Sequence, residues 1–471
     1  MITSKDVKIL DINSQYFGTP IEKLMENAGS GATKFIKQYC KTNKIKVKPS
    51  EILVIANHGN NGGDGFVVAR KLNCKVYFIG ERKKLKRATK KNFNKLKKKQ
   101  FVKKIGKPKL IVDAIFGIGI SGEIREPYKN IIKQVNKLHN SGTKVISLDI
   151  PSGLNPDTGK GKLIIKADKI LTFHDVKPGL NKVKNKVIII PIGIPRKANE
   201  LIGPGELFTV LKPRKLDAHK GQHGKVLIIG GSEKYPGAPL LAAQAICAYR
   251  SGVDWITIAT PEKVAWVIHT YAPELITHKI KTAFFQKRHV KQMLKIEKDF
   301  DCVLIGPGMG IEASDFVREF VKKSKKPLVI DADALKAIKL QDVNNAILTP
   351  HKAELQQLLK NSKLSAHNFH NKLKNNIILA KGNTDVIISK DKVKYNKTGN
   401  PAMTVAGTGD VLAGLAAGFL AQSNDLFNSA AAASFINGYI GDKIYKKIGQ
   451  GLLPSDLIKN ISIIIKKLLK D

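Results

Sequence analysis

A Gly- and Asn-rich hexapeptide, NNGGDG at residues 60–65, lies between an apolar run and an amphipathic segment. Its asparagines supply amide groups, its aspartate supplies a carboxylate, and its glycines permit close approach of the backbone. A strand, such a turn and a helix aim backbone N–H groups and a helix N-terminus at a phosphate. Asn-Gly is also a common turn pair, so a tight strand-to-helix turn is the alternative. Six consecutive residues of these types favour a binding loop.

Two later apolar runs also end in polar residues. Asp113 lies late in LIVDAIF and is followed by a glycine-rich loop, while Asp149 and Ser152 follow VISL. The carboxyl ends of parallel strands meet at one edge of a sheet, where ligands bind. Either aspartate alone would be explained by the commoner role of a helix N-cap. Together with NNGGDG they predict a ligand site, because a buried carboxylate is costly unless it is paired or functional.

In the second half of the chain, AGTGD at residues 406–410 opens a long run of small residues. Backbone N–H groups there would face a phosphate at a helix N-terminus, with Asp410 beside them as a base. The alternative is that Gly407 and Gly409 pack against a sheet, which leaves the carboxylate unexplained. KGNTD at 381–385 ends a strand just upstream and is a candidate nucleotide contact. The absence of GxxxxGKS/T excludes a P-loop NTPase.

Three weaker signals precede AGTGD. The turn IGPGMG at 305–310 is too rich in glycine to be ordinary. Ala238 lies among small residues where a strand approaches a helix, and close helix packing is the alternative there. His351 follows a proline at the end of an apolar run. A lone histidine is usually a surface or packing residue, so His351 gains weight only from its neighbours.

Short apolar runs rich in β-branched residues must position these groups, and they predict buried strands of parallel sheets. In the first half these runs are residues 52–56, 76–80, 110–116, 145–150, 169–173 and 187–194. In the second half they are residues 225–232, 255–260, 302–308, 327–335, 346–350, 376–382 and 385–389. Several of the intervals between them are long enough for crossover helices, and residues 24–39 supply a helix before the first strand.

The interruption between the two series of strands predicts a domain boundary. Residues 196–215 are rich in Pro, Gly and charge, and they indicate a linker or the start of a second domain. A chain of 471 residues also exceeds what one core needs. We therefore expect an α/β protein of two tandem α/β sandwiches, residues 1–210 and 211–471. The halves share no motif, so the chain is a fusion rather than a duplication.

The charge of the chain is strongly unbalanced: 81 Lys and Arg against 38 Asp and Glu give a formal net charge of +43. Such a field favours polyanions. Lysine is spread along nearly the whole chain, however, and signals of nucleic-acid-binding folds are absent, so we predict no nucleic-acid partner. The run Arg82–Lys109 holds fifteen basic residues and no acidic one. Its apolar spacing predicts a basic amphipathic helix with a solvated face, and a nucleic-acid or membrane patch is the alternative.

The cysteines and the apolar windows bear on the location of the protein. Cys40, Cys74, Cys247 and Cys302 lie far apart, which excludes a disulfide scaffold and fits a reducing compartment. The first residues carry charges where a signal peptide would be apolar. The most apolar windows are shorter than the ~20 residues of a membrane span. We expect a cytoplasmic protein with no membrane partner.

The motifs of the first half resemble the epimerase domain of the NAD(P)H-hydrate repair enzymes. NAG and then GNNGGDG, DAIFGIG with REPY, and SLDIPSGLNPDTG occur in that order over most of residues 1–210. The resemblance implies a Rossmann-like domain and a site for the hydrated nicotinamide nucleotide. The residues that it implies as contacts are Asn60, Asn61, Gly62, Gly63, Asp64, Gly117, Ile118, Gly119, Ile120, Ser121, Gly122, Glu123, Tyr128 and Asp149.

The same resemblance implies a potassium ion held by Asn61, Asp113 and Ser152, whose oxygen donors suit a hard ion. We expect Asp149 to be the acid–base group of the epimerase. This domain would interconvert two epimers that differ at the hydroxyl-bearing sixth carbon of the hydrated nicotinamide ring. The route would pass through a ring-opened or iminium intermediate.

GTGD, GPGMG, the triplet TPH and KG resemble the ribokinase-like superfamily, and more narrowly the ADP-dependent NAD(P)H-hydrate dehydratases, over residues 213–471. The resemblance implies that Asp410 faces the hydrate hydroxyl and takes its proton as ADP phosphorylates it. It implies further substrate contacts at Ala238, Gly308 and His351. It implies ADP contacts at Lys381, Gly382, Asn383, Thr384, Asp385 and Gly409.

The resulting interpretation is a bifunctional enzyme that epimerises hydrated NADH and NADPH and dehydrates the S form at the expense of ADP. A divalent metal, magnesium, would neutralise the transferring charge. The alternative enzyme is a small-molecule kinase of the ribokinase superfamily, which would not need the NNGGDG domain. Apart from its small-molecule substrates, we expect the partner of the chain to be a further copy of itself, as a homo-oligomer.

Overall fold

The computed structural model describes residues 1–119, 122–211, 213–214, 216–246 and 251–469, and the chain divides into units Met1–Ala198 and Asn199–Asp471. The division lies before the expected boundary at residue 210. The segment read as a linker or a domain start forms helices α6 (Arg196–Glu200) and α7 (Pro204–Val210). The interior of α7 belongs to the hydrophobic core of the second unit. Residues 199–211 are therefore the start of the second unit.

The first unit is built on a six-stranded sheet with the order β2-β1-β3-β4-β5-β6, in which every neighbouring pair is parallel. All six predicted strands are confirmed, although several are shorter than the apolar runs that predicted them. Their bounds are β1 (Ile52–Ala56), β2 (Lys75–Phe78), β3 (Leu110–Ala114), β4 (Lys144–Leu148), β5 (Lys169–Phe173) and β6 (Val187–Ile190).

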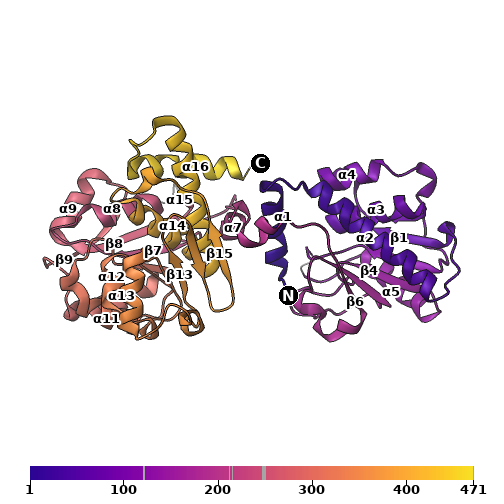
Figure 1. Ribbon diagram of the computed structural model, residues 1–471, viewed down its shortest axis with the longest axis horizontal. Coiled ribbons are helices and arrows are strands. Elements are labelled where there is room, and N and C mark those ends of the chain that lie inside the picture. The colour runs from indigo at the N-terminus through magenta and orange to yellow at the C-terminus, as the bar shows by residue number, and fades with distance from the viewer. Residues whose placement is uncertain (120–121, 212, 215, 247–250, 470–471) are drawn as a thin grey trace. The chain divides into compact units, whose positions relative to one another are not determined.

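Helices cover both faces of this sheet, as its uninterrupted apolar strands predicted. One face packs on α2 (Ile21–Thr42) and α3 (Asn60–Leu72), and the other packs on α5 (Tyr128–Asn140) (Figure 1). Successive residues of β1 alternate between the two cores. A first helix, α1 (Ser4–Tyr16), was not predicted.

The predicted basic helix covers only part of the run Arg82–Lys109. Only α4 (Arg87–Asn94) is an α-helix, with short 3-10 turns before and after it. Ala88, Phe93 and Leu96 are buried as predicted, whereas the lysines and arginines of the run are exposed. The Phe93 ring packs against Phe66 and other phenylalanines. Ala88 and Phe93 of α4 thus anchor the segment, together with Leu96 just after the helix.

The second unit is built on a nine-stranded sheet with the order β15-β14-β13-β12-β11-β10-β7-β8-β9. Its strands are parallel except that β14 runs antiparallel to both of its neighbours. The bounds are β7 (Lys225–Ile229), β8 (Trp255–Pro261), β9 (Ile276–Ile280), β10 (Cys302–Ile305), β11 (Leu328–Ile330), β12 (Ala346–Leu348), β13 (Ile377–Ala380), β14 (Asp385–Ile388) and β15 (Val393–Asn396). Strands β9 and β15 were not predicted, because these edge strands carry polar residues among their apolar ones.

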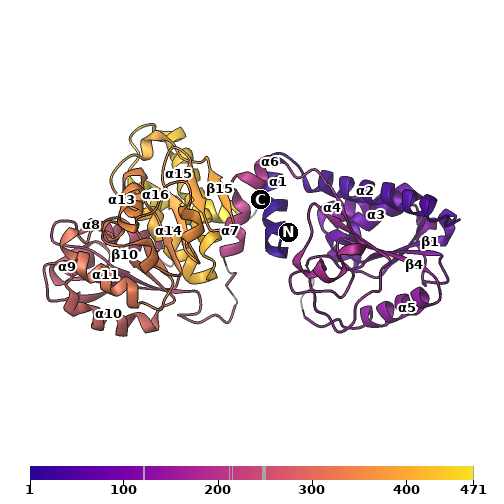
Figure 2. The same ribbon diagram turned by 60° about the horizontal axis from the view of Figure 1, so that its bottom comes forward.

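The second sheet is also covered on both faces (Figure 2). One face packs on α7, α8 (Gly237–Ile246), α14 (Thr408–Ser423), α15 (Leu426–Ile448) and α16 (Pro454–Leu468). The other packs on α10 (Val290–Ile296), α11 (Ser314–Lys323), α12 (Asp333–Ala337) and α13 (Lys352–Ser362). Helix α9 (Glu262–Tyr271) follows β8. None of the helices within the described ranges is long and apolar enough to cross a membrane.

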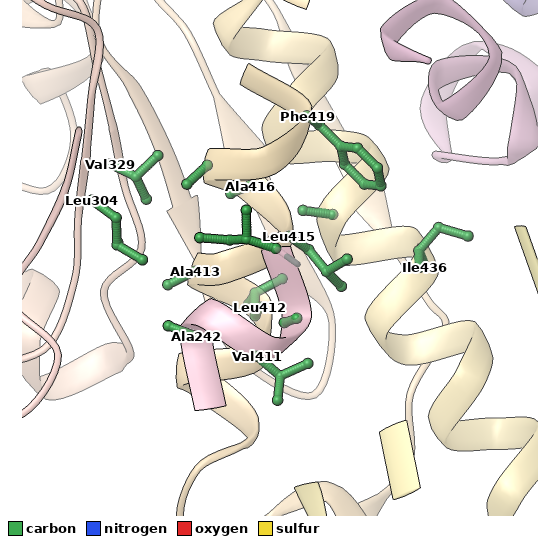
Figure 3. Packing of buried hydrophobic residues seen from close by; sticks show 14 of the residues in the cluster. Ala242, Leu304, Val329, Val411, Leu412, Ala413, Leu415, Ala416, Phe419 and Ile436 are labelled. Atoms are coloured by element: carbon green, nitrogen blue, oxygen red, sulfur yellow. The ribbon is translucent and has the colours of Figure 1, made fainter. Parts of the chain in front are cut away.

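Helix α14 lies in the core of the second unit, where its small residues pack closely against neighbouring elements. Its Ala413 and Ala416 point toward Leu304 and Val329 of the sheet, as Figure 3 shows. A Cβ at Gly414 would overlap the backbone of α8, so the glycine permits close packing of the two helices. The small residues after AGTGD therefore fix the position of the start of α14.

Candidate active sites

The first site lies where the strand order of the first sheet reverses, between β1 and β3. Ligands of open parallel sheets bind at such a point, outside the carboxyl ends of the strands. A cavity of about 450 Å³ occurs there. The predicted residues that line it are Asn60, Asn61, Asp64, Gly117, Ile118, Gly119 and Asp149. The structure therefore brings these residues together at this edge of the sheet.

NNGGDG forms the first turns of α3 rather than a loop in front of it. Its glycines permit other segments of the protein to lie close to the start of α3. A Cβ at Gly62 would overlap the carbonyl oxygen of Asn57, and one at Gly63 would lie 2.6 Å from the Met25 side chain. These glycines hold the start of α3 against its neighbours, so that Asn61 and Asp64 reach the cavity.

Hydrogen bonds through Phe116 and Ser152 link the three predicted potassium ligands. Ser152 Oγ donates to Asp113 Oδ1 at 2.6 Å and accepts from the Phe116 amide at 2.9 Å. Asn61 Nδ2 donates to the Phe116 carbonyl oxygen at 2.9 Å and to the Leu148 carbonyl oxygen at 3.2 Å. Burial raises the pKa of Asp113, although hydrogen bonds from Ser152 act against this shift. Within the described residues, the buried Asn61 Oδ1 has no hydrogen-bond partner.

Asp149 forms a buried ion pair that was not predicted. Lys177 Nζ lies 2.6 Å from Asp149 Oδ1 and also donates to Thr172 Oγ1 at 3.0 Å and to the Phe173 carbonyl oxygen at 2.9 Å. Lys177 is fully buried. Asp149 adopts a left-handed backbone conformation with φ of 65°. The signal for Lys177 was its position just after β5, whose carboxyl end meets the same edge of the sheet.

Two more carboxyl groups line this cavity, Asp64 from α3 and Asp11 from α1. Burial, followed by the negative charge of Asp149, raises the pKa of Asp11 to about 6. The same two causes raise the pKa of Asp64 well above its ordinary value. Asp11 was missed because the helix that carries it was not predicted. The cavity thus combines three carboxyl groups with the Lys177 ammonium group.

The remaining predicted residues of the first half lie in different places. Tyr128 Oη donates to Asn57 Oδ1 at 3.2 Å, and its ring packs 4.9 Å from the Phe116 ring. Gly122 and Glu123 line a separate hollow beside residues 160–163, where Glu123 forms an ion pair with Lys162. The structure does not bring these two residues to the cavity. Ile120 and Ser121 lie outside the described residues.

The second site surrounds the N-terminus of α14. Gly407 precedes the helix with φ of 97°, a left-handed conformation that suits glycine, and Asp410 lies in the first turn. Lys381, which follows β13, places its Nζ 2.9 Å from Asp331 Oδ1 after β11. Asp331 also accepts from Thr349 Oγ1 at 2.7 Å. Asp331 and Thr349 were not predicted, although both follow strands of the same edge.

Charges at this second site act on one another. Burial, followed by the negative charge of Asp331, raises the pKa of Asp410 to about 7. Burial acts to lower the pKa of Lys381, but the negative charges of Asp331, Glu354 and Asp410 outweigh it and the pKa is raised. The predicted pair of Lys381 and Asp410 therefore lies in one electrostatic cluster.

Other predicted residues surround this cluster. The His351 ring is the N-cap of α13, and its backbone pairs with that of Lys381. A Cβ at Gly409 would lie 3.6 Å from Lys381 Nζ, and one at Gly308 would lie 3.1 Å from Ala238 Cβ. Asp385 accepts from the Gly382 amide at 3.0 Å and from Ser434 Oγ at 2.6 Å. Asn383 and Thr384 lie in the connection between β13 and β14.

Comparison with known proteins places both units in one family. A family model described as NAD(P)H-hydrate dehydratase matches residues 226–463, and one described as YjeF-related protein N-terminus matches residues 21–179. A bifunctional NAD(P)H-hydrate repair enzyme of Archaeoglobus fulgidus is 37% identical over 98% of this chain and 97% of its own length. The corresponding enzyme of Pyrobaculum aerophilum is 35% identical over 99% of this chain and 98% of its own.

Among solved structures, a ribokinase-like superfamily protein of Enterococcus faecalis is 26% identical, with a TM-score of 0.50. The match covers 57% of this chain and 96% of that chain. The structural comparison therefore agrees with the ribokinase-like fold expected for the second half. With relatives matched from end to end, the chain belongs to the family of bifunctional NAD(P)H-hydrate repair enzymes.

Proposed function

We propose that the first unit epimerises hydrated NADH and NADPH, and that the second unit dehydrates the S epimer at the expense of ADP. The observation that carries this division is that Asp149 and Asp410 lie in separate α/β units, each at the carboxyl edge of its own sheet. Relatives that match from end to end and are named bifunctional NAD(P)H-hydrate repair enzymes support the pairing. They also argue against a fused small-molecule kinase.

In the epimerase unit, Asp149 is the proposed acid–base group. Lys177 stabilises its carboxylate in a buried setting where a lone charge would be expensive. Asp149 therefore starts the reaction as an anion and accepts the proton of the water that adds to the ring. Asn61, Asp64 and Gly117 line the same cavity and would contact the nucleotide. Gly122 and Glu123 would contact only a more distant part of the ligand.

Asn61, Asp113 and Ser152 are the proposed holders of potassium. The unpartnered Asn61 Oδ1 is the feature that fits an ion, since a buried amide oxygen without a donor is otherwise costly. Asp113 supplies the negative charge nearby. The ion would fix the loop that carries Phe116 and would supply positive charge beside the nucleotide. The proton movements remain with the carboxyl groups.

In the dehydratase unit, Asp410 takes the proton of the substrate hydroxyl as the hydroxyl oxygen attacks the terminal phosphorus of ADP, the bond from that phosphorus to the bridging oxygen breaks, and AMP leaves. A base with a pKa near 7 is suited to this role at neutral pH. Phosphate then leaves the phosphorylated hydrate far more readily than hydroxide would leave the hydrate, and this elimination restores the reduced nicotinamide ring. Ala238, Gly308 and His351 would contact the hydrate.

Lys381, Gly382, Asn383, Thr384, Asp385 and Gly409 are the proposed ADP contacts. The Lys381 ammonium group would face phosphate oxygens beside the amide groups of the α14 N-terminus, where negative charge is favoured. The carboxylates of Asp331 and Glu354 are oxygen donors of the kind that magnesium prefers. Magnesium would neutralise charge on the transferring phosphoryl group.

The decisive experiment follows both activities in the full chain. The purified protein is mixed with a mixture of R and S NADH hydrates, without nucleotide, with ADP, and with ATP, and the absorbance of NADH is recorded. We expect complete recovery of NADH with ADP, because the first unit converts R into S as S is consumed. Recovery that stops at the initial S fraction would contradict the epimerase assignment. No recovery with either nucleotide would contradict the dehydratase assignment.

We further propose that the protein works in the cytoplasm as a homo-oligomer and without a nucleic-acid partner. Cys40, Cys74 and Cys302 are free thiols, in keeping with a reducing compartment. Trp266 and Tyr271 on α9 are exposed and offer an apolar contact for a second copy. Light scattering after size-exclusion chromatography would test the assembly, since a monomer would contradict it.

A further inference from the structure

The carboxyl group of Asp11 on α1 lines the epimerase cavity and belongs to no motif of the proposed mechanism. Val7 lies one turn earlier on the same helix face and lines the same cavity. The helix is anchored by its buried side chains, which include Ile9 and Leu10. Ser4 at its start donates its amide to Asp157 Oδ1 at 2.8 Å. Asp11 is therefore held at the cavity by a fixed element.

The cavity around Asp11 contains groups of both charges. Asp149 and Asp64 are the acidic ones, and the basic groups that line it are Lys8, His58, Lys86, His174 and Lys177. The Lys177 ammonium group forms an ion pair with the Asp149 carboxylate. Within the described part of the chain, no donor forms a hydrogen bond with the Asp11 carboxyl group. This differs from Asp149, whose charge is fixed by an ion pair.

The protonation of Asp11 suits an acid rather than a structural anion. Burial and the charge of Asp149 favour the neutral carboxyl, and a pKa of about 6 leaves it close to the operating range of an enzyme. Asp64 is buried, whereas Asp11 is only partly buried and lines the cavity. Asn61 lines the same cavity, and its unpartnered Oδ1 is a second sign that a ligand belongs here.

We infer that Asp11 is a second catalytic acid–base residue of the epimerase and works as the partner of Asp149. This inference rests on the proposed epimerase function. The protonated Asp11 donates its proton to the departing hydroxyl at the sixth carbon, the carbon–oxygen bond breaks, and water leaves. The ring nitrogen supplies its electron pair to form the iminium.

Water then adds to the other face of the iminium carbon, and its proton passes to the Asp149 carboxylate. The reverse passage uses the same two groups with their roles exchanged. The two carboxyl groups come from different elements, α1 and the end of β4. Exchange between the two faces of the ring requires a proton donor and a proton acceptor, and these two carboxyl groups of the cavity would supply them. No oxidant or further reactant is consumed.

The test uses Asp11→Asn in the full chain, with R-NADH hydrate and no nucleotide, so that only epimerisation is observed. Chromatography separates the R and S forms. We expect kcat to fall by about 10²-fold or more with little change in KM. Asp11→Glu should restore part of the rate. In the unmodified protein kcat should decline as the pH rises above about 6, and the Asn variant should lose this decline.

Asp6→Asn is the matched control, because Asp6 lies on the same helix but accepts hydrogen bonds from Thr3 and does not line the cavity. It should epimerise at nearly the normal rate. An Asp11→Asn variant with the kcat and pH profile of the unmodified protein would overturn the inference. Failure of the unmodified protein to epimerise would instead overturn the proposed function. Recovery of activity in Asp11→Glu separates lost chemistry from lost folding.

Discussion

The ammonium group of Lys177 lies 2.6 Å from the carboxylate of Asp149, with only 1% and 11% of the two side chains exposed. Removal of one partner from such a pair leaves an uncompensated buried charge. Lys177→Met should therefore destabilise the first unit by about 3–5 kcal/mol and abolish epimerisation. Urea unfolding followed by circular dichroism measures the loss of stability.

The control for that variant is Lys162→Met, which breaks the exposed ion pair with Glu123. Solvent screens an exposed pair, so the unfolding curve should hardly move. Equal effects of the two substitutions would show that the buried position of Lys177 is not the cause.

Asp410→Asn should separate the two activities. The amide retains the size of the side chain but does not accept the proton of the attacking hydroxyl, a contribution of roughly 10²–10⁴-fold. Epimerisation uses another sheet and should persist. The measurement compares equilibration of R and S hydrates with ADP-dependent formation of NADH. Restoration of NADH at the normal rate would make Asp410 a helix-terminal residue only.

The pH dependence of dehydration should follow Asp410. Its pKa is about 7 in the folded chain against 3.8 ordinarily, so the base is available only as the pH rises through about 7. The kcat/KM for S hydrate should therefore rise with pH across this range, and Asp410→Asn should lack that limb. A rise of kcat/KM with the same midpoint in the Asp410→Asn variant would show that another group causes it.

The same raised pKa makes the free energy of unfolding fall as the pH rises, whereas it makes kcat/KM rise. The folded state holds the Asp410 proton between pH 3.8 and about 7, whereas the unfolded state has released it. This contribution to stability is complete below that range and is lost as the pH rises through it. Asp410→Asn should flatten this part of the dependence of unfolding free energy on pH.

Exchange of potassium for lithium should weaken the first unit. Lithium is too small to contact the oxygen atoms of Asn61, Asp113 and Ser152 together, so epimerase activity or the Tm of that unit should fall. Dehydration of S hydrate provides the internal control because it takes place in the other unit. Equal activity and Tm in both salts would remove the ion from the epimerase.

Sequence patterns predicted the sheets well because each buried strand is a short apolar run flanked by polar residues. They located the strand ends that carry Asp113, Asp149 and Lys381. They missed Lys177 and Asp11, whose roles depend on which segments meet in space. Asp11 lies on a helix whose mixture of polar and apolar residues resembles many surface segments. Gly122 and Glu123 show the converse, since nearness to Gly117 in sequence did not place them at the cavity.

The start of the second unit has a practical consequence for dissection of the enzyme. Glu206 of α7 forms a buried ion pair of 2.6 Å with Lys394 of β15, so the short helix neutralises a charge inside the later sheet. A fragment that begins at residue 211 would leave that lysine buried and unpaired, at a cost of about 3–5 kcal/mol. A fragment that begins at residue 199 keeps the pair, and a clean division of the two activities requires this earlier cut.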